Sequence, residues 1–300
     1  MRLSTSTNIV FQSCPTQSLY DVRHCLDLCT ESGYHVFDLN CCDNCEPGYP
    51  LTQDDWESWV SAVKKQAEIL GVVFNQSHNP IYNICHPEQV DNWEWQEELT
   101  RRSMIASATL GVEWVVVHAG TALPNGVYSK KETVERNASY FGAMAEFAVS
   151  LGMKGIAIEN MAYRGPWSNS LPPQLCATTD GLIELIDYIG KDSVGVCWDF
   201  GHANLCHESQ TDSLRRVGSR LKATHVNDNM GHADDHTLPF LGTVDWPAVM
   251  AVLGEVGYEG DLTYEIHKYL RRAPADLVPL FLKKSVEVGN YLTDLATRVR

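Results

Sequence analysis

Acidic and imidazole side chains recur in this sequence directly after short runs of β-branched residues. The five residues that close such runs are His118, Glu159, Asp199, His225 and Glu265. Carboxylate oxygens and imidazole nitrogens suit divalent cations such as Mn²⁺, Mg²⁺, Co²⁺ and Zn²⁺. Carboxylates gathered in one place repel each other unless a cation or protons neutralise them. The pattern therefore indicates a metal site that is assembled from several strand ends.

The runs alternate with longer amphipathic stretches, which predicts strands alternating with helices. The predicted strands are Asn8–Gln12, Val36–Asn40, Val72–Ser77, Trp114–His118, Gly155–Asn160, Val194–Phe200, Lys222–Asn227 and Gly260–Ile266. The predicted helices include Asp54–Leu70, Glu94–Leu110, Lys131–Leu151, Thr179–Ile189, Trp246–Val256 and a closing helix over Asp276–Tyr291. Glycines typical of helix C-termini stand before the next strand at Gly71, Gly111, Gly152 and Gly257.

Strands that are nearly continuous in Val and Ile, each followed by a helix, predict a parallel sheet buried on both faces. Eight such units predict a single (β/α)₈ TIM barrel that spans residues 1–300 as one domain. An open doubly wound sheet is the other architecture considered, but no G-x-G-x-x-G follows the first strand. Cys41–Pro50 and Leu171–Pro173 are expected to be long βα loops at the C-terminal mouth, where the strand-end residues would meet.

The composition narrows the classes of partner. The net charge is −15, which argues against extended binding to a polyphosphate backbone. The sequence has no apolar run of transmembrane length and no apolar leader after Met1, so we expect a cytoplasmic protein with no membrane partner. The ten cysteines are expected to be reduced, and the C-x-x-C of Cys42 and Cys45 is interpreted as a loop with incidental thiols.

The strand-end residues also carry a family resemblance. The chain resembles the xylose isomerase-like TIM-barrel superfamily, especially the sugar phosphate isomerase/epimerase branch related to endonuclease IV. The resemblance runs from about Asn8 to the final helix and is sharpest over Trp114–His267, including the segment His225–Trp246. It implies that the metal ligands are Glu159, Asp199, His225 and Glu265.

A second layer of residues matches the additional positions that hold three zinc ions in endonuclease IV. These residues are His78, His118, His202, Asp234 and His236. They could bind a second or third metal, or they could hydrogen-bond to substrate hydroxyls as the family isomerases do. The substrate-binding interpretation is preferred, because neutral imidazole is as good a hydrogen-bonding group as it is a ligand.

The resemblance implies a divalent-metal-dependent isomerase or epimerase that acts on a sugar, a polyol or a sugar derivative. Glu159 and Glu265 would be the catalytic pair, moving a proton next to a metal-bound carbonyl, and His202 would orient the enediolate oxygen. A lyase or dehydratase could begin with the same proton abstraction. Asn229-Met230-Gly231 stands where ketose 3-epimerases carry an arginine, so the sugar is left open, as are the metal and a homo-oligomeric assembly.

The alternative from another reaction class is an endonuclease IV-like metal-dependent phosphodiesterase. The ligand set permits it, but the acidic composition argues against it. Endonuclease IV also carries Gly-Glu-Gly after its Asp-x-His, where this chain has Leu241-Gly242-Thr243. A degenerate barrel that only binds sugar is the third interpretation, and the intact ligand set disfavours it.

The remaining histidines and aromatic residues are expected to be structural. Arg164 is the one loop cation placed to meet a phosphate or carboxylate. Trp198 precedes Asp199 and should point into the layer between barrel and helices. Trp93 and Trp95 are expected to pack in the core or at the surface. The histidines assigned to packing or to the surface are His24, His35, His86, His207, His232 and His267.

Overall fold

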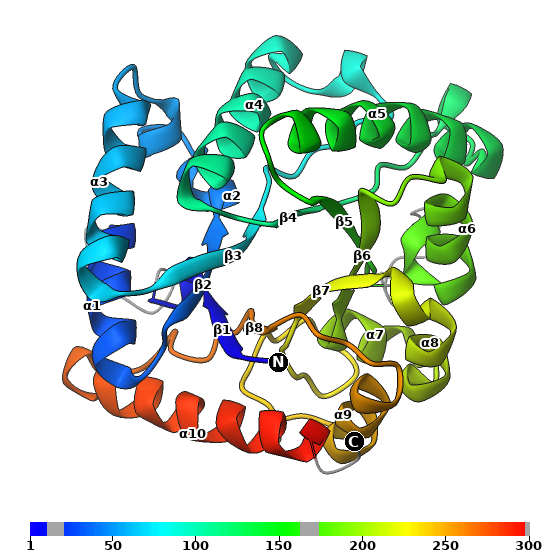
Figure 1. Ribbon diagram of the computed structural model, residues 1–300. Helices are drawn as coiled ribbons and strands as arrows, with labels where there is room; N and C mark the ends of the chain where they lie inside the picture. Colours follow the sequence, from blue (N-terminus) through cyan, green and yellow to red (C-terminus); the bar gives the residue numbers. More distant parts are fainter. Residues whose placement is uncertain (11–20, 163–173, 298–300) are drawn as a thin grey trace.

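The computed structural model describes residues 1–10, 21–162 and 174–297. Parallel strands form a ring, and helices surround it (Figure 1). The strands are β1 (Leu3–Ser6), β2 (Val36–Asn40), β3 (Val73–His78), β4 (Trp114–Val117), β5 (Gly155–Glu159), β6 (Val194–Asp199), β7 (Leu221–His225) and β8 (Leu262–Tyr264). The α-helices are α1 (Val22–Ser32), α2 (Cys41–Asn44), α3 (Trp56–Leu70), α4 (Trp93–Leu110), α5 (Lys130–Ser150), α6 (Thr179–Ile189), α7 (Phe200–Cys206), α8 (Gln210–Val217), α9 (Trp246–Glu255) and α10 (Val278–Thr297).

The sheet is eight-stranded in the order β7-β6-β5-β4-β3-β2-β1-β8. Between β7 and β8 the ring closes at the C-terminal end, where Val226 bridges Tyr264 in parallel. The amide of Val226 donates to the carbonyl of Thr263 at 2.7 Å, and the amide of Glu265 donates to the carbonyl of Val226 at 3.2 Å. The predicted (β/α)₈ TIM barrel is confirmed.

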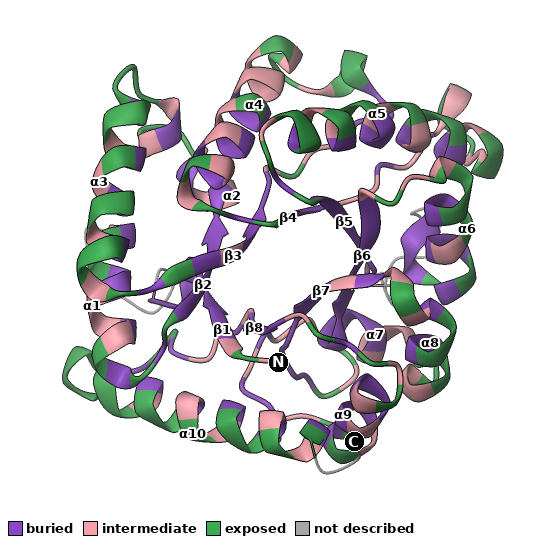
Figure 2. Ribbon diagram, in the orientation of Figure 1, coloured by how far each residue is buried: buried purple, intermediate pink, exposed green. Residues whose placement is uncertain are grey.

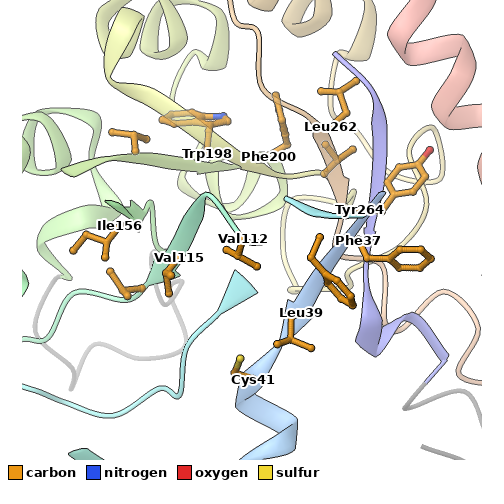
Figure 3. Packing of buried hydrophobic residues seen from close by; sticks show 14 of the residues in the cluster. Phe37, Leu39, Cys41, Val112, Val115, Ile156, Trp198, Phe200, Leu262 and Tyr264 are labelled. Atoms are coloured by element: carbon orange, nitrogen blue, oxygen red, sulfur yellow. The ribbon is translucent and has the colours of Figure 1, made fainter. Parts of the chain in front are cut away.

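The main apolar core lies between the barrel and the helices. Alternate strand residues point outward, and Phe37, Leu39, Trp198 and Tyr264 are among those buried in this layer (Figure 3). Trp198 lies in this layer, as its position before Asp199 predicts. The helices bury one side and expose the other, so that the outer surface of the ring is mostly exposed (Figure 2).

The inside of the barrel has a polar side and an apolar side. Small apolar residues cluster on β4 to β7, and they are Val116, Ala157, Cys197 and Ala223. On the other side, β8, β1, β2 and β3 place polar residues in the same layer. These buried residues are Thr263, Ser4, Ser6, Asp38 and Gln76.

The polar side explains why the first predicted strand was wrong. Ile9 and Val10 suggested a strand over Asn8–Gln12, but they are buried in the single 3₁₀ turn Thr7–Val10, and residues 11 and 12 lie outside the described part of the chain. The strand is instead Leu3–Ser6, which pairs with β8 and β2. This strand carries the hydroxyl side chains of Ser4, Thr5 and Ser6, so no apolar run marks it in the sequence.

The other predicted elements lie within two residues of their observed bounds, except that the closing helix ends at Thr297 and not at Tyr291; Thr179–Ile189 matches at both ends. Gly71, Gly111, Gly152 and Gly257 all have positive φ at the helix ends, as predicted. The predicted loop Cys41–Pro50 instead begins with the short helix α2, because Asn40 caps it by accepting from the amide of Asp43. Leu171–Pro173 lies outside the described residues.

The described cysteines are all free, including Cys42 and Cys45, and their reduced state stays a prediction. None of the helices in the described ranges is long and apolar enough to cross a membrane.

Candidate metal centre at the mouth of the barrel

The predicted ligands occupy equivalent places at the ends of consecutive strands. Glu159 is the last residue of β5, Asp199 of β6 and His225 of β7, and Glu265 follows the last residue of β8. Their neighbours Ile158 and Trp198 belong to the core layer outside the barrel. Since side chains alternate along a strand, the ligand candidates point inward, above the barrel interior.

His225 lies at the centre of this arrangement. Its Nδ1 is 3.2 Å from Oε2 of Glu159 and 3.6 Å from Oε2 of Glu265. The His225 side chain is 1% exposed, and its Nδ1 has no hydrogen-bond partner. A buried ring nitrogen without a partner is costly. Its position between two carboxylate oxygens is therefore suited to a cation that all three groups would share.

Asp199 has a different set of contacts. Its Oδ1 accepts from the amide of His202 at 2.6 Å, which caps α7, and its Oδ2 accepts from Nδ2 of Asn227 at 2.7 Å. The contact with Asn227 requires a glycine nearby, because a Cβ at Gly201 would lie 1.8 Å from Oδ1 of Asn227. Asp199 thus acts as a helix cap at the site, and its role as a ligand stays a prediction.

His78 and His118 meet the other side of Glu159. Nε2 of His118 is 3.0 Å from Oε2 of Glu159 and 3.0 Å from Nε2 of His78. Nε2 of His78 is itself 3.4 Å from the same carboxylate oxygen. The His78 ring also stacks on that of His225, with centroids 5.5 Å apart. His78, His118 and Glu159 form one cluster whose candidate ligand atoms lie within 4.8 Å of one another, close enough to hold a metal ion.

His202, Asp234 and His236 form a second such cluster. Nδ1 of His202 lies 3.2 Å from Oε1 of Glu159, and its Nε2 lies 3.9 Å from Oδ2 of Asp234. The same Asp234 oxygen is 2.8 Å from Nε2 of His236. Nδ1 of His236 is 3.4 Å from Oε2 of Glu265. All nine residues singled out in the sequence therefore meet at the mouth of the barrel.

The loop that carries Asp234 and His236 is organised by a residue that the sequence analysis missed. Asp228 is fully buried, and its carboxylate accepts four hydrogen bonds. The donors are the backbone amides of Asn229, Phe240 and Val244 and the indole Nε1 of Trp246, at 2.8–3.2 Å. These bonds join both ends of the β7–α9 loop to the end of β7.

The charges at the mouth are balanced between acids and imidazoles. Burial raises the pKa of the Glu159 carboxyl, but the imidazoles of His225 and His118 outweigh it and hold that pKa well below its ordinary value. Burial lowers the pKa of His225, but facing acidic groups, first Cys197 and then Glu159, raise it well above its ordinary value. Burial raises the pKa of Asp199 to about 6. Protons on imidazoles thus compensate the carboxylates, and a bound cation would replace those protons.

A cavity of about 430 Å³ opens above these side chains. Several residues that the sequence analysis did not identify line it, namely Asn8, Asn40, Cys42, Asp43, Ile81, Met161, Ala162, Gln174 and His267. The side-chain oxygens of Asn8 and Gln174 have no hydrogen-bond partner. Both atoms are buried, and each is an unpaired acceptor in a residue that lines the cavity. No apolar run or strand end marks either residue in the sequence.

His267 corrects one of the sequence-based expectations. It was assigned to packing or to the surface, but it lines the cavity and its ring lies 4.2 Å from that of His236. Its position two residues after Glu265 was the available signal, because both residues then point the same way along the strand direction.

Arg164, which was predicted to meet an anion, lies outside the described residues. Trp95 lies in the wall of a neighbouring cavity with Cys42 and Ile81, and Trp93 packs against Tyr82.

Comparisons with known proteins agree with the barrel fold. A family model described as xylose isomerase-like TIM barrel matches residues 26–284. The protein y4fM of Sinorhizobium fredii is 27% identical over 262 residues, which are 81% of this chain and 80% of that protein.

Solved structures with the same fold extend over nearly the whole chain. A D-tagatose 3-epimerase-like protein aligns with a TM-score of 0.72 and 20% identity over 99% of each chain. The IolI protein, whose structure holds a zinc atom, aligns with a TM-score of 0.69 and 17% identity over 100% of this chain and 99% of its own. At these identities the likeness shows the fold alone.

Proposed function

Because the chain belongs to the xylose isomerase-like TIM barrel family, we propose that it is a divalent-metal-dependent isomerase or epimerase of a sugar or sugar derivative. The observation that carries the proposal is the unpartnered Nδ1 of His225, which faces a carboxylate oxygen of Glu159 and one of Glu265. The epimerase-like and zinc-holding structures of the same fold support it.

The donor set fits a divalent cation. Glu159, His225 and Glu265 would hold the ion, with Asp199 completing the set if its carboxylate turns from its present hydrogen bonds. Oxygen donors with one imidazole suit Mn²⁺, Mg²⁺, Co²⁺ or Zn²⁺. When bound, such an ion polarises a substrate carbonyl and acidifies the neighbouring C–H bond.

The two glutamates would move the proton, and they differ in access. Both line the cavity, but the Glu265 side chain is 12% exposed, whereas Glu159 is 1% exposed and is contacted by four imidazoles. We assign the exchange of a proton with the substrate carbon to both residues and expect Glu265 to be the more accessible base. Positioned acid–base groups contribute about 10²–10⁴-fold to rate.

The surrounding polar residues would orient the substrate. His202 is fixed by a 2.9 Å contact between its Nδ1 and the carbonyl of Asn160, so its Nε2 is the nitrogen that can serve a substrate oxygen. The free amide oxygens of Asn8 and Gln174 would accept from hydroxyl groups. A substrate rich in hydroxyls satisfies these buried groups, whereas an apolar substrate leaves them unpaired at a cost.

Proton exchange provides the direct test. The Mn²⁺-loaded protein is incubated in D₂O with a panel of ketoses, keto-polyols and keto-glycosides, and deuterium at the carbon next to the carbonyl is read by NMR. Glu159→Gln and Glu265→Gln should each lower the exchange rate by about 10²–10⁴-fold. Glu259→Gln, an exposed residue at the opposite end of the barrel, is the matched control and should not change it. Exchange that survives in both site variants would refute the mechanism.

The same proton abstraction would serve a lyase or dehydratase acting on a sugar derivative. Product analysis of the same incubations separates the outcomes. An isomerase or epimerase returns the proton and conserves the mass of the substrate, whereas elimination releases water or a leaving group.

A metal-dependent phosphodiesterase is the second candidate, and the clusters His78–His118–Glu159 and His202–Asp234–His236 favour it. Several metal ions would stabilise both oxygens of an in-line displacement. Against it, the described residues that line the cavity include no Lys or Arg, and the net charge is −15. Cleavage of abasic-site DNA without proton exchange into any sugar would decide for this candidate.

A further inference from the structure

Beneath the metal centre, the barrel interior holds a carboxylate that the proposed chemistry does not use. Asp38 lies on β2, is 0% exposed and faces inward between Ser6 of β1 and Gln76 of β3. Its Oδ2 accepts from Nε2 of Gln76 at 2.6 Å. Its Oδ1 has no hydrogen-bond partner. A buried carboxyl group with a single donor leaves one oxygen unpaired, which is costly.

The group that can compensate it is the ring of His225. Nε2 of His225 lies 3.7 Å from Oδ2 of Asp38, which is within ion-pair range. In the described part of the chain, His225 is the cationic partner recorded for this carboxylate. The other nitrogen of the same ring faces Glu159 and Glu265. The imidazole therefore connects the buried Asp38 to the proposed metal centre.

We infer that Asp38 is the positioning residue of the metal centre: its carboxylate faces Nε2 of His225 at 3.7 Å, favours a proton on that nitrogen and so keeps the Nδ1 lone pair directed at the cation. This inference rests on the proposed metal-binding role of His225. A ligating histidine commonly donates its other N–H to a carboxylate, which fixes the tautomer and orients the ring. The His78 ring stacks on the ring of His225 and limits its tilting. What remains to be fixed is which ring nitrogen carries the proton and how the ring is turned in its own plane.

Gln76 would hold Asp38 in place for this role. Its Nε2 also contacts the carbonyl of Thr224 at 3.3 Å, and its Oε1 accepts from Oγ1 of Thr263 at 3.4 Å. Gln76 lies on β3, and through its bond to Asp38 it links β2 to β7 and β8 across the barrel interior. The chain Gln76–Asp38–His225 passes from the polar side of the interior to the metal centre.

Metal affinity tests the inference without reference to catalysis. Mn²⁺ and Zn²⁺ are titrated separately into the metal-free full chain by calorimetry with a competing chelator. Asp38→Asn should weaken binding by about 10–100-fold, and Gln76→Leu should weaken it less. Ser4→Ala is the control: Ser4 lies in the same polar layer but bonds to Asn75, and its variant should bind like the wild type.

A second readout separates positioning from general damage to the fold. In the metal-free protein, at a pH high enough to leave the His225 ring neutral, ¹⁵N NMR should find its single ring proton on Nε2, and Asp38→Asn should shift the ring toward a mixture of tautomers. The double variant Asp38→Leu/Gln76→Leu removes the buried polar pair together and leaves no unpaired Asp38 carboxylate, so its melting temperature should be no lower than that of Gln76→Leu while its metal affinity falls further.

The outcomes distinguish the two proposals. If the wild type binds neither ion, the proposed function and this inference both fail. If the wild type binds metal and folded Asp38→Asn binds it equally well with an unchanged tautomer, the inference is overturned and the proposed function stands. A parallel loss of affinity and of melting temperature in every variant, Ser4→Ala included, would also overturn it, because the effect would then be structural.

Discussion

The base of the β7–α9 loop and the mouth of the barrel both bury carboxylates, but their partners differ. Asp228 accepts from four N–H donors that are fixed by the backbone and by Trp246. Glu159 and Glu265 instead face imidazoles, which can release their protons. A carboxylate that is saturated by permanent donors stabilises the fold, whereas one that is surrounded by titratable groups can exchange protons for a cation. For these carboxylates, the kind of hydrogen-bonding partner, more than burial, distinguishes a structural role from the proposed functional one.

Removing the carboxylate of Asp228 should have the largest effect on stability. Asp228→Ala leaves four N–H donors without an acceptor, and we expect a loss of about 3–5 kcal/mol in the free energy of unfolding. Urea denaturation followed by circular dichroism measures it. Metal affinity should fall as well, because His236, which contacts Glu265 at 3.4 Å, lies on the loop that these bonds hold. A loss below about 1 kcal/mol would show that the four bonds do not organise the loop.

The stability contributed by the mouth of the barrel should depend on pH and on bound metal, whereas the stability contributed by Asp228 at the loop base should not. The raised pKa values of His225 and His202 contribute stability below the unfolded value of about 6.5, and this contribution is lost as pH rises through the folded values. The melting temperature of the metal-free protein should therefore fall from about pH 6.5 upward. Mn²⁺ or Zn²⁺ at 100 times its Kd should add about 2.7 kcal/mol and remove most of this fall.

Scanning calorimetry with and without chelator measures that difference. His225→Asn is the matched variant, since it removes one raised pKa and one ligand together. If the pH dependence of the melting temperature is the same with and without metal, the imidazole protons do not compete with the cation.

A substitution at Gly201 tests the contact between Asn227, a permanent hydrogen-bond donor, and Asp199, a predicted metal ligand. In Gly201→Ala the new Cβ would lie 1.8 Å from Oδ1 of Asn227, so that side chain has to move and release Asp199. We expect a loss of about 1–3 kcal/mol, together with weaker metal binding. The control is Ser61→Ala on the exposed face of α3. Gly71→Ala would not serve, because the positive φ of Gly71 would add backbone strain. Unchanged metal affinity would separate Asp199 from the ligand set.

The smallest effect is expected at Asp245, the exposed N-cap of α9. Asp245→Ala removes one contact with the amide of Ala248 at 3.2 Å and should cost about 1 kcal/mol without changing metal affinity. Comparison with Asp228→Ala then isolates the effect of burial and of the number of donors. A larger loss at Asp245 than at Asp228 would reverse the comparison on which these predictions rest.

The strand ends were predictable because their chemistry interrupts a regular pattern. Glu159, Asp199 and His225 each end a run of buried residues, and the barrel fold brings the ends of such runs together. The helix ends were marked by glycines for the same local reason. The histidine His267 was missed because it stands beyond the strand, although it shares the direction of Glu265.

Residues in the polar half of the barrel interior left no such signal. Asp38 lies within a predicted strand, but a single acidic residue between Phe37 and Leu39 gives no information about the group that faces it. Ser4 and Ser6 hid the first strand for the same reason. The donors of Asp228 come from residues 229–246, and only the folded loop shows that they converge. Contacts across the barrel depend on three-dimensional closure and are not encoded in local periodicity.

The seam between β7 and β8 has a consequence for the order of events in folding. The ring closes when β8 takes its place between β1 and β7, and the contact between Arg2 and Asp261 on the β1 side spans 259 positions of the chain. Contacts of such long range form slowly, because the entropy of closing a long loop is lost before the contact stabilises the chain. Glu265 is added to the site only at this step. A partly synthesised chain that lacks β8 therefore presents an incomplete set of ligands, and high-affinity capture of a cation should report that the ring has closed.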